Sequence, residues 1–267
     1  MRAVSATIIT LNEEVYIGRC LKSLEGIADE IIVVDSFSTD RTAEICRSMG
    51  VRFYQREFPG YRDQKNYASS LATHEYILSV DADEELSEEL RQSLIEFKNM
   101  EGEVADGYSV NRLNAYRGQW IKGCGWYPDR KVRLYNRNRG RWGGYNVHEV
   151  VVMERGATTA RLRGDLLHRV YDSLEEFAEK VNLYSTLSSM EYQKHGRKGG
   201  LAKALFHMVW CFFRSYIVRG GFLEGPNGYI ICKMLSYGVF LKYIKLRDLN
   251  RRCRKEAIAE QQGRQAE

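Results

Sequence analysis

The sequence predicts an α/β fold with a mostly parallel central sheet, followed by a C-terminal extension of amphipathic helices. Three observations indicate this class. Short β-branched runs alternate with helical patterns over residues 1–100, and these runs are apolar enough to be buried on both faces of a sheet. Two longer apolar patterns with helical spacing then occur within residues 196–267.

Four strand–helix units are expected in residues 1–100. Each strand is a short apolar run, and each helix has apolar residues at helical spacing. The predicted strands are Val4–Leu11, Glu30–Asp35, Val51–Gln55 and Tyr76–Asp81, and the predicted helices are Tyr16–Leu24, Thr42–Met49, Asp63–Ala72 and Ser87–Phe97. Ser87 suits the N-cap of the last helix. Consecutive units of this kind favour an open sheet with right-handed crossovers.

The pattern changes after residue 106. Residues 107–170 are rich in Gly, Arg, Tyr and Trp, and a long helix is predicted at Leu174–Tyr192. Short strands at Tyr108–Leu113, Lys131–Tyr135 and Val147–Met153 are expected to complete the sheet and to carry a second pocket. We therefore expect one domain over residues 1–195, with halves at 1–100 and 101–195, and a basic helical extension over 196–267.

The formal net charge of +5 conceals a strong polarity along the chain. Residues 1–193 hold 25 basic and 30 acidic residues, whereas residues 194–255 hold 14 basic residues and only Glu224 and Asp248 as acids. A uniformly basic nucleic-acid binder is therefore not indicated, and no nucleic-acid partner is expected. The six cysteines are scattered without a CxxC pair, and the N-terminus shows no long apolar run, so a reducing, cytoplasmic setting is predicted.

The two apolar segments of the extension are Leu201–Val218 and Tyr229–Ile244. Both are shorter than the ~20 largely apolar residues of a spanning helix, and both contain charges. They are interpreted as amphipathic helices that lie in a membrane interface or pack on a partner. Peripheral contact with the inner face of the cell membrane and a homo-oligomer formed through these helices both stay open.

Polar residues follow three of the predicted strands, at Thr10–Glu13, Asp35–Asp40 and Asp81–Glu84. Ligands of open parallel sheets bind beyond the carboxyl ends of the strands, so these side chains are expected to meet at one edge. Capping of the helix at Thr42 explains one of the hydroxyl or carboxylate groups before it, but it does not account for Asp35. No GxGxxG or P-loop motif follows a strand, which argues against a dinucleotide site.

The tripeptide Asp81-Ala82-Asp83 is the sharpest candidate for chemistry. Two carboxylates one residue apart, just after a buried strand, can both reach one hard cation such as Mg²⁺ or Mn²⁺. Such an ion would offset the charge that develops on a diphosphate leaving group. The alternative is an acidic loop that enriches the first turn of the next helix, as the helix dipole favours.

The order of four motifs resembles family 2 glycosyltransferases with the GT-A fold. The motifs are TLNEE at 10–14, DEIIVVDSFSTDRT at 29–42, QKNYA at 64–68 and SVDADE at 79–84. Two later pieces, NVHE at 146–149 and GFLEGPNGYI at 221–230, resemble a bacterial subgroup that includes lipopolysaccharide inner-core β-1,4-glucosyltransferases. The resemblance implies an inverting hexosyltransferase that moves a sugar from a nucleotide diphosphate sugar, such as UDP-glucose, to a hydroxyl of a glycolipid or lipopolysaccharide core.

The resemblance also implies roles for single residues. Residues 1–100 would form the nucleotide-sugar half and residues 101–195 the acceptor half. The implied roles are Thr10 and Glu13 beside the nucleotide, Asp35 on the base, Lys65 near the donor, Asp81 near the ribose or the metal, and Asp83 as a ligand of a divalent cation. Ser36 departs from the pattern, because many relatives have a second Asp directly after the first.

An inverting displacement needs a general base that takes the proton of the acceptor hydroxyl. By position, Glu149 is the expected base, and the neighbouring His148 is the alternative because its ordinary pKa suits proton transfer near neutrality. Adjacent strand residues point to opposite faces, so one of the two is expected to face the pocket. Asp129 is a third candidate.

Two other functions are compatible with parts of the sequence. A sugar nucleotidyltransferase also binds nucleotides and a metal on an α/β sheet, but the Gly-rich loop that holds a triphosphate does not follow the first strand. A non-catalytic, membrane-associated basic scaffold would account for the positive C-terminal segment. It would leave the carboxylate motifs unexplained.

Overall fold

The protein was analysed as a computed structural model, which describes the backbone of residues 1–145 and 148–266 and the side chains of 1–144 and 149–254. The chain divides into two compact units, which are taken in turn. One comprises Met1–Asn114 and Pro128–Val170, and the other comprises Ala115–Tyr127 and Tyr171–Glu267. This grouping puts the long helix after residue 173 with the C-terminal helices, whereas the sequence predicts that the first domain ends at residue 195. The domain boundary stays a prediction.

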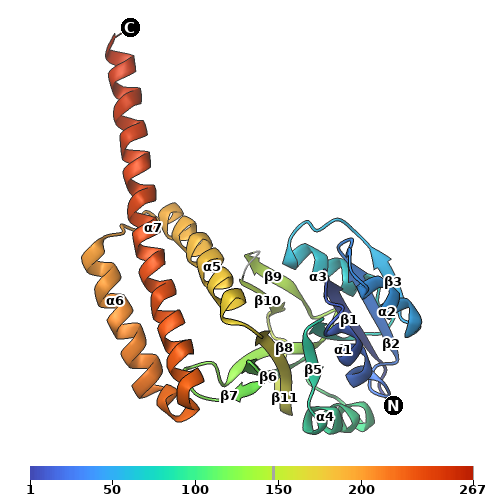
Figure 1. The fold of residues 1–267 in the computed structure, drawn as a ribbon. Helices are drawn as coiled ribbons and strands as arrows, with labels where there is room; N and C mark the ends of the chain where they lie inside the picture. Colours follow the sequence, from blue (N-terminus) through green and yellow to red (C-terminus); the bar gives the residue numbers. More distant parts are fainter. Residues whose placement is uncertain (146–147, 267) are drawn as a thin grey trace. The chain divides into compact units, whose positions relative to one another are not determined.

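The first unit is built on a mixed sheet whose parallel half comes from the N-terminal strands (Figure 1). Its strands are β1 (Val4–Thr10), β2 (Glu30–Asp35), β3 (Arg52–Gln55), β4 (Tyr76–Asp81), β5 (Glu84–Leu86), β6 (Gly107–Tyr116), β8 (Asp129–Asn136) and β11 (Thr159–Tyr171). The strand order is β3-β2-β1-β4-β8-β6-β11-β5, with β3, β2, β1 and β4 parallel and β8 antiparallel to β4. The predicted α/β class with a central sheet and C-terminal helices is confirmed.

Three helices connect the parallel strands as the alternating pattern predicted, and a fourth follows the short strand β5. They are α1 (Ile17–Leu24), α2 (Thr42–Ser48), α3 (Tyr61–Ser70) and α4 (Glu88–Asn99). All four apolar residues at helical spacing in α1 are fully buried. The Ser87 hydroxyl caps α4 by accepting a hydrogen bond from the Leu90 amide at 3.3 Å, as expected of an N-cap serine.

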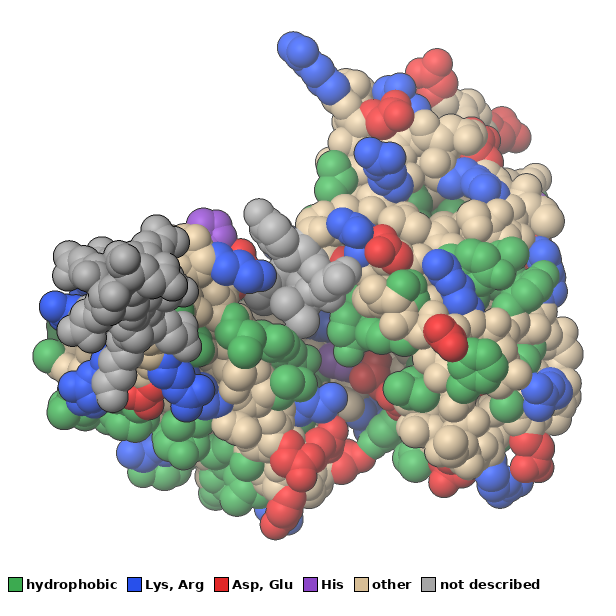
Figure 2. All heavy atoms as spheres, turned by 90° about the horizontal axis from the view of Figure 1, so that it is seen from above, with side chains coloured by type: hydrophobic (Ala, Val, Ile, Leu, Met, Phe, Trp, Pro, Cys, Tyr) green, Lys and Arg blue, Asp and Glu red, His purple; other side chains and the backbone are tan. Residues whose placement is uncertain are grey.

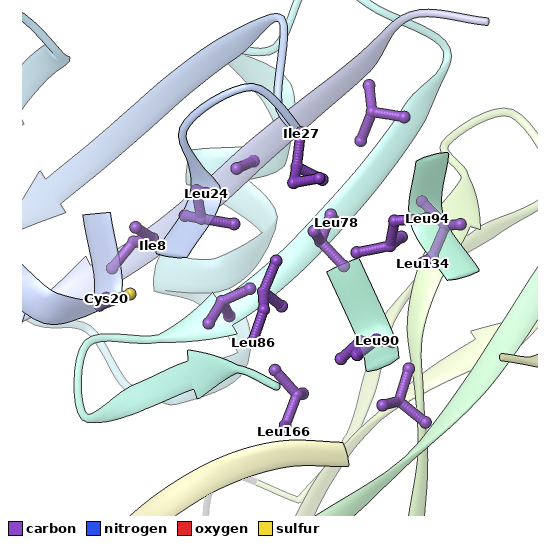
Figure 3. Close-up of a cluster of buried hydrophobic side chains, with 14 of the residues drawn as sticks. Ile8, Cys20, Leu24, Ile27, Leu78, Leu86, Leu90, Leu94, Leu134 and Leu166 are labelled. Carbon is purple, nitrogen blue, oxygen red and sulfur yellow. The ribbon is translucent and has the colours of Figure 1, made fainter. Parts of the chain in front are cut away.

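One face of the sheet carries the main apolar core (Figure 3). Ile8 and Leu78, from neighbouring strands, meet Leu24 from α1 and Leu90 and Leu94 from α4, and all five are fully buried. Burying a leucine or isoleucine side chain stabilises a fold by about 1.5–3 kcal/mol, so this layer holds the parallel strands rigidly. A rigid sheet is the support that a site at the strand ends requires.

A separate two-stranded hairpin completes the first unit. It consists of β9 (Gly140–Tyr145) and β10 (His148–Met153), which pair antiparallel with Glu149 opposite Gly144. The Asn66 side chain of α3 forms two hydrogen bonds with the backbone of Trp142, donating at 3.0 Å and accepting at 3.1 Å. These two hydrogen bonds fix the hairpin against α3.

The second unit is helical. Its elements are the short strand β7 (Gln119–Ile121), α5 (Leu174–Lys194), α6 (Leu201–Phe213), the π turn η1 (Arg214–Val218), the 3₁₀ turn η2 (Gly221–Glu224) and α7 (Gly225–Ala266). Helix α7 lies beside both α5 and α6 (Figure 1). Its buried residues Ile231 and Cys232 pack with Tyr116 and Phe177 in an apolar cluster of its own.

The predicted apolar segments are helical, but their roles differ. The segment predicted at Tyr229–Ile244 belongs to the longer helix α7 and supplies buried residues. By contrast, Leu201–Val218 is only 11% buried, with a mean hydropathy of 1.2 over 18 residues, and has the length and composition of a membrane-spanning helix. Helix α6 therefore leaves most of its apolar surface uncovered.

Candidate active site

Strand register brings three predicted site residues to the same edge of the sheet. Thr10 at the end of β1 lies opposite Asp35 at the end of β2, and Ile9 lies opposite Asp81 at the end of β4. The carboxyl ends of these parallel strands therefore lie at one level. This is the edge at which open α/β sheets bind their ligands.

A buried ammonium group connects this edge to the hairpin. The Nζ atom of Lys65 lies 2.8 Å from Oδ1 of Asp81 and 3.0 Å from Oε1 of Glu149. It also lies 4.4 Å from the centre of the Trp142 ring, within range of a cation–π contact. The Lys65 side chain is only 5% exposed, because α3 turns this polar face toward the site rather than toward solvent.

Asp81 is held by a second cation. The Arg133 guanidinium of β8 donates to Oδ2 of Asp81 at 2.9 Å and to Oε1 of the fully buried Glu84 at 2.7 Å. Burial opposes the charged form of Asp81, but the charges of Arg133 and Lys65 outweigh it and hold the pKa of this carboxyl well below its usual range. Asp81 is therefore a fixed carboxylate with both oxygens occupied by cations.

Asp83 belongs to a different arrangement. Its Oδ2 atom lies 3.0 Å from Nε2 of His168 on β11, and Nδ1 of His168 lies 2.8 Å from Oδ1 of Asn114. Burial alone would lower the pKa of His168, but the Asp83 charge raises it above its ordinary value. A carboxylate oxygen and an imidazole nitrogen thus lie together, and Asn114 sets the orientation of the ring.

Asp35 and Thr10 lie in the nucleotide half of the predicted site. The fully buried Asp35 accepts hydrogen bonds from the Ser38 amide at 3.0 Å and from the Gln55 side chain at 3.1 Å, and it also pairs with the Ser38 hydroxyl. The buried Thr10 hydroxyl oxygen has no hydrogen-bond partner among the described residues. The Glu13 amide donates to the Thr42 hydroxyl at 2.8 Å, which fixes the turn after β1.

The three residues predicted as candidate bases are Glu149, His148 and Asp129, and they differ in what the structure shows of their surroundings. Glu149 lies in the network, with one oxygen on Lys65 and a side chain that is 16% exposed. Asp129 is paired with Arg112 at 2.8 Å and with Lys131 at 3.5 Å. Arg112 also lies 3.8 Å from Oε1 of Glu84, so Asp129 is connected to the Lys65 network through intermediate ion pairs rather than by direct contact with Lys65. The side chain of His148 lies outside the described residues, so the choice between His148 and Glu149 stays a prediction.

Sequence reasoning assigned no role beside Asp81, Asp83 or Lys65 to Arg133, His168 or Trp142. Arg133 and His168 lie on strands of the second half of the main sheet and Trp142 lies on the separate β9–β10 hairpin, and the sequence pattern gave no register for either against the first half of the sheet. His168 lies in β11, opposite Glu84 in the antiparallel pairing with β5, and neither strand was predicted. A buried cation near Asp81 could have been predicted from the sequence, because a carboxylate directly after a buried strand requires a charged or hydrogen-bonding partner.

A divalent cation requires ligand atoms that are not already engaged in these ion pairs. Among the described residues, no group of three or more His, Cys, Asp or Glu side chains converges in the way that a metal-ligand cluster would. Asp83 and His168 supply two ligand atoms of suitable kinds, while Asp81 is occupied by Lys65 and Arg133. Magnesium and manganese commonly take one or two protein ligands and complete their shell with water and phosphate oxygens, so the pair fits such an ion.

Comparison with known proteins identifies the class of this site. Residues 5–159 match the family model for glycosyl transferase family 2. The chain belongs to this family and is an enzyme of the transferase class. It is 32% identical over 261 residues to an uncharacterized glycosyltransferase of Rickettsia prowazekii, covering 94% of this chain and 88% of that protein.

A second relative has a more specific name. The chain is 34% identical over 254 residues to the lipopolysaccharide core biosynthesis glycosyltransferase LpsC of Rhizobium meliloti, covering 91% of each chain. Among solved structures, it is similar to Mycobacterium tuberculosis glucosyl-3-phosphoglycerate synthase, with 25% identity, a TM-score of 0.35 and coverage of 44% and 45% of the two chains. The family assignment rests on the sequence matches.

Proposed function

We propose that this enzyme transfers a sugar, with inversion, from a nucleotide diphosphate sugar such as UDP-glucose to a hydroxyl of a lipopolysaccharide core or another cell-envelope glycan. Membership of glycosyl transferase family 2 supports the reaction class. The LpsC relative, similar over nearly the whole length of both chains, supports a core glycan as the acceptor.

One observation carries the proposal. The Lys65 ammonium contacts both Asp81, which lies on the donor side of the predicted site, and Glu149, the expected base. A donor-side carboxylate and an acceptor-side carboxylate are thereby held on one buried cation. The contacts support this proposal because the two residues with the proposed roles belong to one network of fixed groups, and such preorganised groups need no rearrangement as the reaction proceeds.

The donor is proposed to lie along the strand ends. Thr10 and Glu13 would lie beside the nucleotide, and Asp35 would bind the base through its carboxylate. The unpartnered Thr10 hydroxyl supports this placement, because a buried hydroxyl without a partner is costly unless a ligand or water satisfies it. Lys65 would add positive charge beside the diphosphate.

A divalent cation, Mg²⁺ or Mn²⁺, is proposed at Asp83, with His168 as a second ligand through Nε2. Such an ion would offset the negative charge that develops on the diphosphate leaving group. Asp81 was expected as a further ligand. Its two cationic partners favour a different role for it, namely fixing Lys65 and Arg133 near the ribose and diphosphate.

Glu149 is proposed to act as the general base. The acceptor oxygen forms a bond to the anomeric carbon, the bond from that carbon to the diphosphate oxygen breaks, and the hydroxyl proton passes to a carboxylate oxygen of Glu149. Its second carboxylate oxygen is the candidate proton acceptor, because Lys65 contacts Oε1. Removal of a general base typically lowers the rate by a factor of about 10² to 10⁴.

The protein is further proposed to act in the cytoplasm, peripherally bound to the inner face of the cell membrane. The uncovered apolar surface of α6 and the positive charge of residues 194–255 support this location. A second copy of the chain is the alternative occupant of that surface.

A panel of nucleotide sugars tests the reaction. We expect one nucleoside diphosphate sugar, with Mn²⁺ present, to raise the thermal unfolding midpoint and to give transfer onto isolated lipopolysaccharide core. The variant Asp83→Asn should lose both effects and should remain folded. Wild-type transfer rates in Asp83→Asn would contradict the metal assignment, and release of pyrophosphate from a nucleoside triphosphate would indicate a nucleotidyltransferase instead.

A further inference from the structure

The helical unit contains a cavity of about 540 Å³ that the proposed sugar transfer does not use. Its walls come from α5, α6, η1, α7 and the loop at residues 124–126. All of these segments belong to the same compact unit. The cavity is therefore a feature of the helical unit itself.

The lining of this cavity is cationic and aromatic. Arg214, Arg219 and Lys242 contribute to the walls, and none of the lining residues is an aspartate or a glutamate. Within the part of the chain that the structure describes, no ion pair is formed by Arg214 or Arg219. Positive charges gathered without acidic partners make a site that attracts an anion.

Neighbouring groups hold two of these cations in place. Lys242 lies 4.4 Å from the centre of the Tyr192 ring and donates to the Tyr192 hydroxyl at 3.3 Å. Arg219 lies against Gly125, where a Cβ atom would come within 2.3 Å of a guanidinium nitrogen. Because Gly125 has no Cβ atom, the Arg219 side chain can lie against the loop at this position.

The cavity is continuous with the uncovered apolar face of α6. Trp210 lines the cavity and is 52% exposed, and its neighbours on the helix are exposed as well: Phe206 by 67%, Val209 by 63% and Phe213 by 46%. Figure 2 shows apolar and basic side chains side by side on the helical unit. Large apolar side chains beside basic groups are typical of a surface that inserts into a lipid headgroup layer.

We propose that this cavity binds the phosphate monoester headgroup of a membrane lipid, whose acyl chains lie against the α6 face. Arginine forms paired, charge-assisted hydrogen bonds with phosphate oxygens, and the three cations of the lining are more than enough to neutralise a monoester dianion. The inference rests on the proposed membrane contact and gives it a specific ligand. It does not depend on the proposed sugar transfer.

The test uses the full-length protein and sedimentation with vesicles. One set contains phosphatidylcholine with phosphatidic acid, and the other contains phosphatidylcholine with oleic acid at matched surface potential. The variant Arg214→Gln/Arg219→Gln removes the cavity arginines. Its matched control is Arg251→Gln/Arg252→Gln, which removes the same charge from exposed positions on α7. The thermal unfolding midpoint shows whether the cavity variant is folded. The variant Arg214→Lys/Arg219→Lys keeps the positive charges and is the conservative control for binding.

We expect the wild-type protein to prefer phosphatidic acid vesicles. The cavity variant should bind them about tenfold or more weakly, since each basic residue near an anionic surface contributes about 1 kcal/mol. The control variant should lose about threefold or less, and the lysine variant should keep much of the binding. Equal losses in the cavity and control variants, or no preference for phosphate, would overturn the headgroup site and leave diffuse membrane contact. Failure to bind either vesicle would overturn the membrane contact as well.

A second pair of measurements distinguishes the source of the phosphate. The variant Phe206→Ser/Val209→Ser should keep weak binding of inorganic phosphate and should lose binding to vesicles. If it bound vesicles as well as the wild type, the acyl-chain contact would be wrong. If the wild-type protein bound inorganic phosphate but neither kind of vesicle, a free phosphate compound would be the ligand. If the wild-type protein were a dimer in solution and this variant a monomer, a second copy of the chain would be the occupant of α6.

Discussion

The Lys65 network gives a quantitative prediction about stability. The change Lys65→Met keeps most of the buried volume but removes the cation between Asp81 and Glu149. At an effective dielectric constant of about 20, two unit charges about 3 Å apart attract each other by about 5 kcal/mol, and the desolvation of the buried ammonium offsets several kcal/mol of the combined attraction. Breaking a buried pair by removing one partner usually costs about 3–5 kcal/mol.

We therefore expect Lys65→Met to lower the free energy of unfolding by about 3 kcal/mol at pH 7.5. Urea unfolding followed by tryptophan fluorescence measures this change, because Trp142 lies against Lys65. The double variant Lys65→Met/Glu149→Gln should be about 1–2 kcal/mol more stable than Lys65→Met alone, because it removes the repulsion between two carboxylates that no longer share a cation. The reasoning is refuted if Lys65→Met changes stability by less than about 1 kcal/mol, or if Glu149→Gln has the same effect in both backgrounds.

Three further changes test other parts of the fold. Burial would raise the pKa of Glu30, but hydrogen bonds from Ser5, Thr73 and Arg52 lower it to about 2, so Glu30→Gln should cost about 2–3 kcal/mol at pH 7. Because the folded pKa lies below the unfolded one, this cost should fade as pH drops from about 4.5 toward 2, and a cost independent of pH would contradict it. Gly164→Ala places a Cβ atom 2.3 Å from the Leu90 amide nitrogen at a residue with positive φ. It should lower the thermal unfolding midpoint by far more than Gly156→Ala, because Gly156 also has a positive φ but has open space around it. Equal shifts of the two midpoints would show that the contact with Leu90 is irrelevant. Glu224→Ala removes the acceptor of the Lys122 and Gly123 amides and should speed their hydrogen exchange at a cost of about 1–2 kcal/mol, whereas unchanged exchange would mean that the carboxylate does not hold this loop.

The N-terminal half of the fold follows closely from the sequence. The strands Glu30–Asp35 and Tyr76–Asp81 have the predicted bounds, because short apolar runs between polar turns leave little choice of where the strand begins and ends. The same logic predicted that Thr10, Asp35 and Asp81 would lie at one edge, since parallel strands end at the same level. Ser87 was identified as a cap from its position before an acidic first turn.

The rest of the site depends on antiparallel pairing, which the sequence does not specify. His168 meets Asp83 only because β11 pairs with β5, a strand of three residues that has no periodic signal. Arg133 and Trp142 reach the site from β8 and β9 through contacts between residues far apart in the chain. Such contacts are set by packing and by loop lengths rather than by a local pattern.

The helical unit shows a different limit. Both C-terminal apolar segments were predicted as equivalent amphipathic helices, yet α7 supplies a buried core and α6 does not. Both segments are apolar with helical spacing, and the distinction arises from which helix the other elements pack against. The exposed faces of Phe206 and Val209 could be located only once the packing of α7 was known.

The most direct test of the proposed site compares the wild-type enzyme with Glu149→Gln in one transfer assay. Labelled sugar is followed from the stabilising nucleotide sugar to lipopolysaccharide core, and donor affinity is measured by calorimetry on the same samples. The account predicts that donor affinity changes by less than about threefold while transfer falls by a factor of about 10² or more. Transfer at close to the wild-type rate by Glu149→Gln, with the protein folded and the donor bound, would show that Glu149 is not the base and that His148 must be tested in its place.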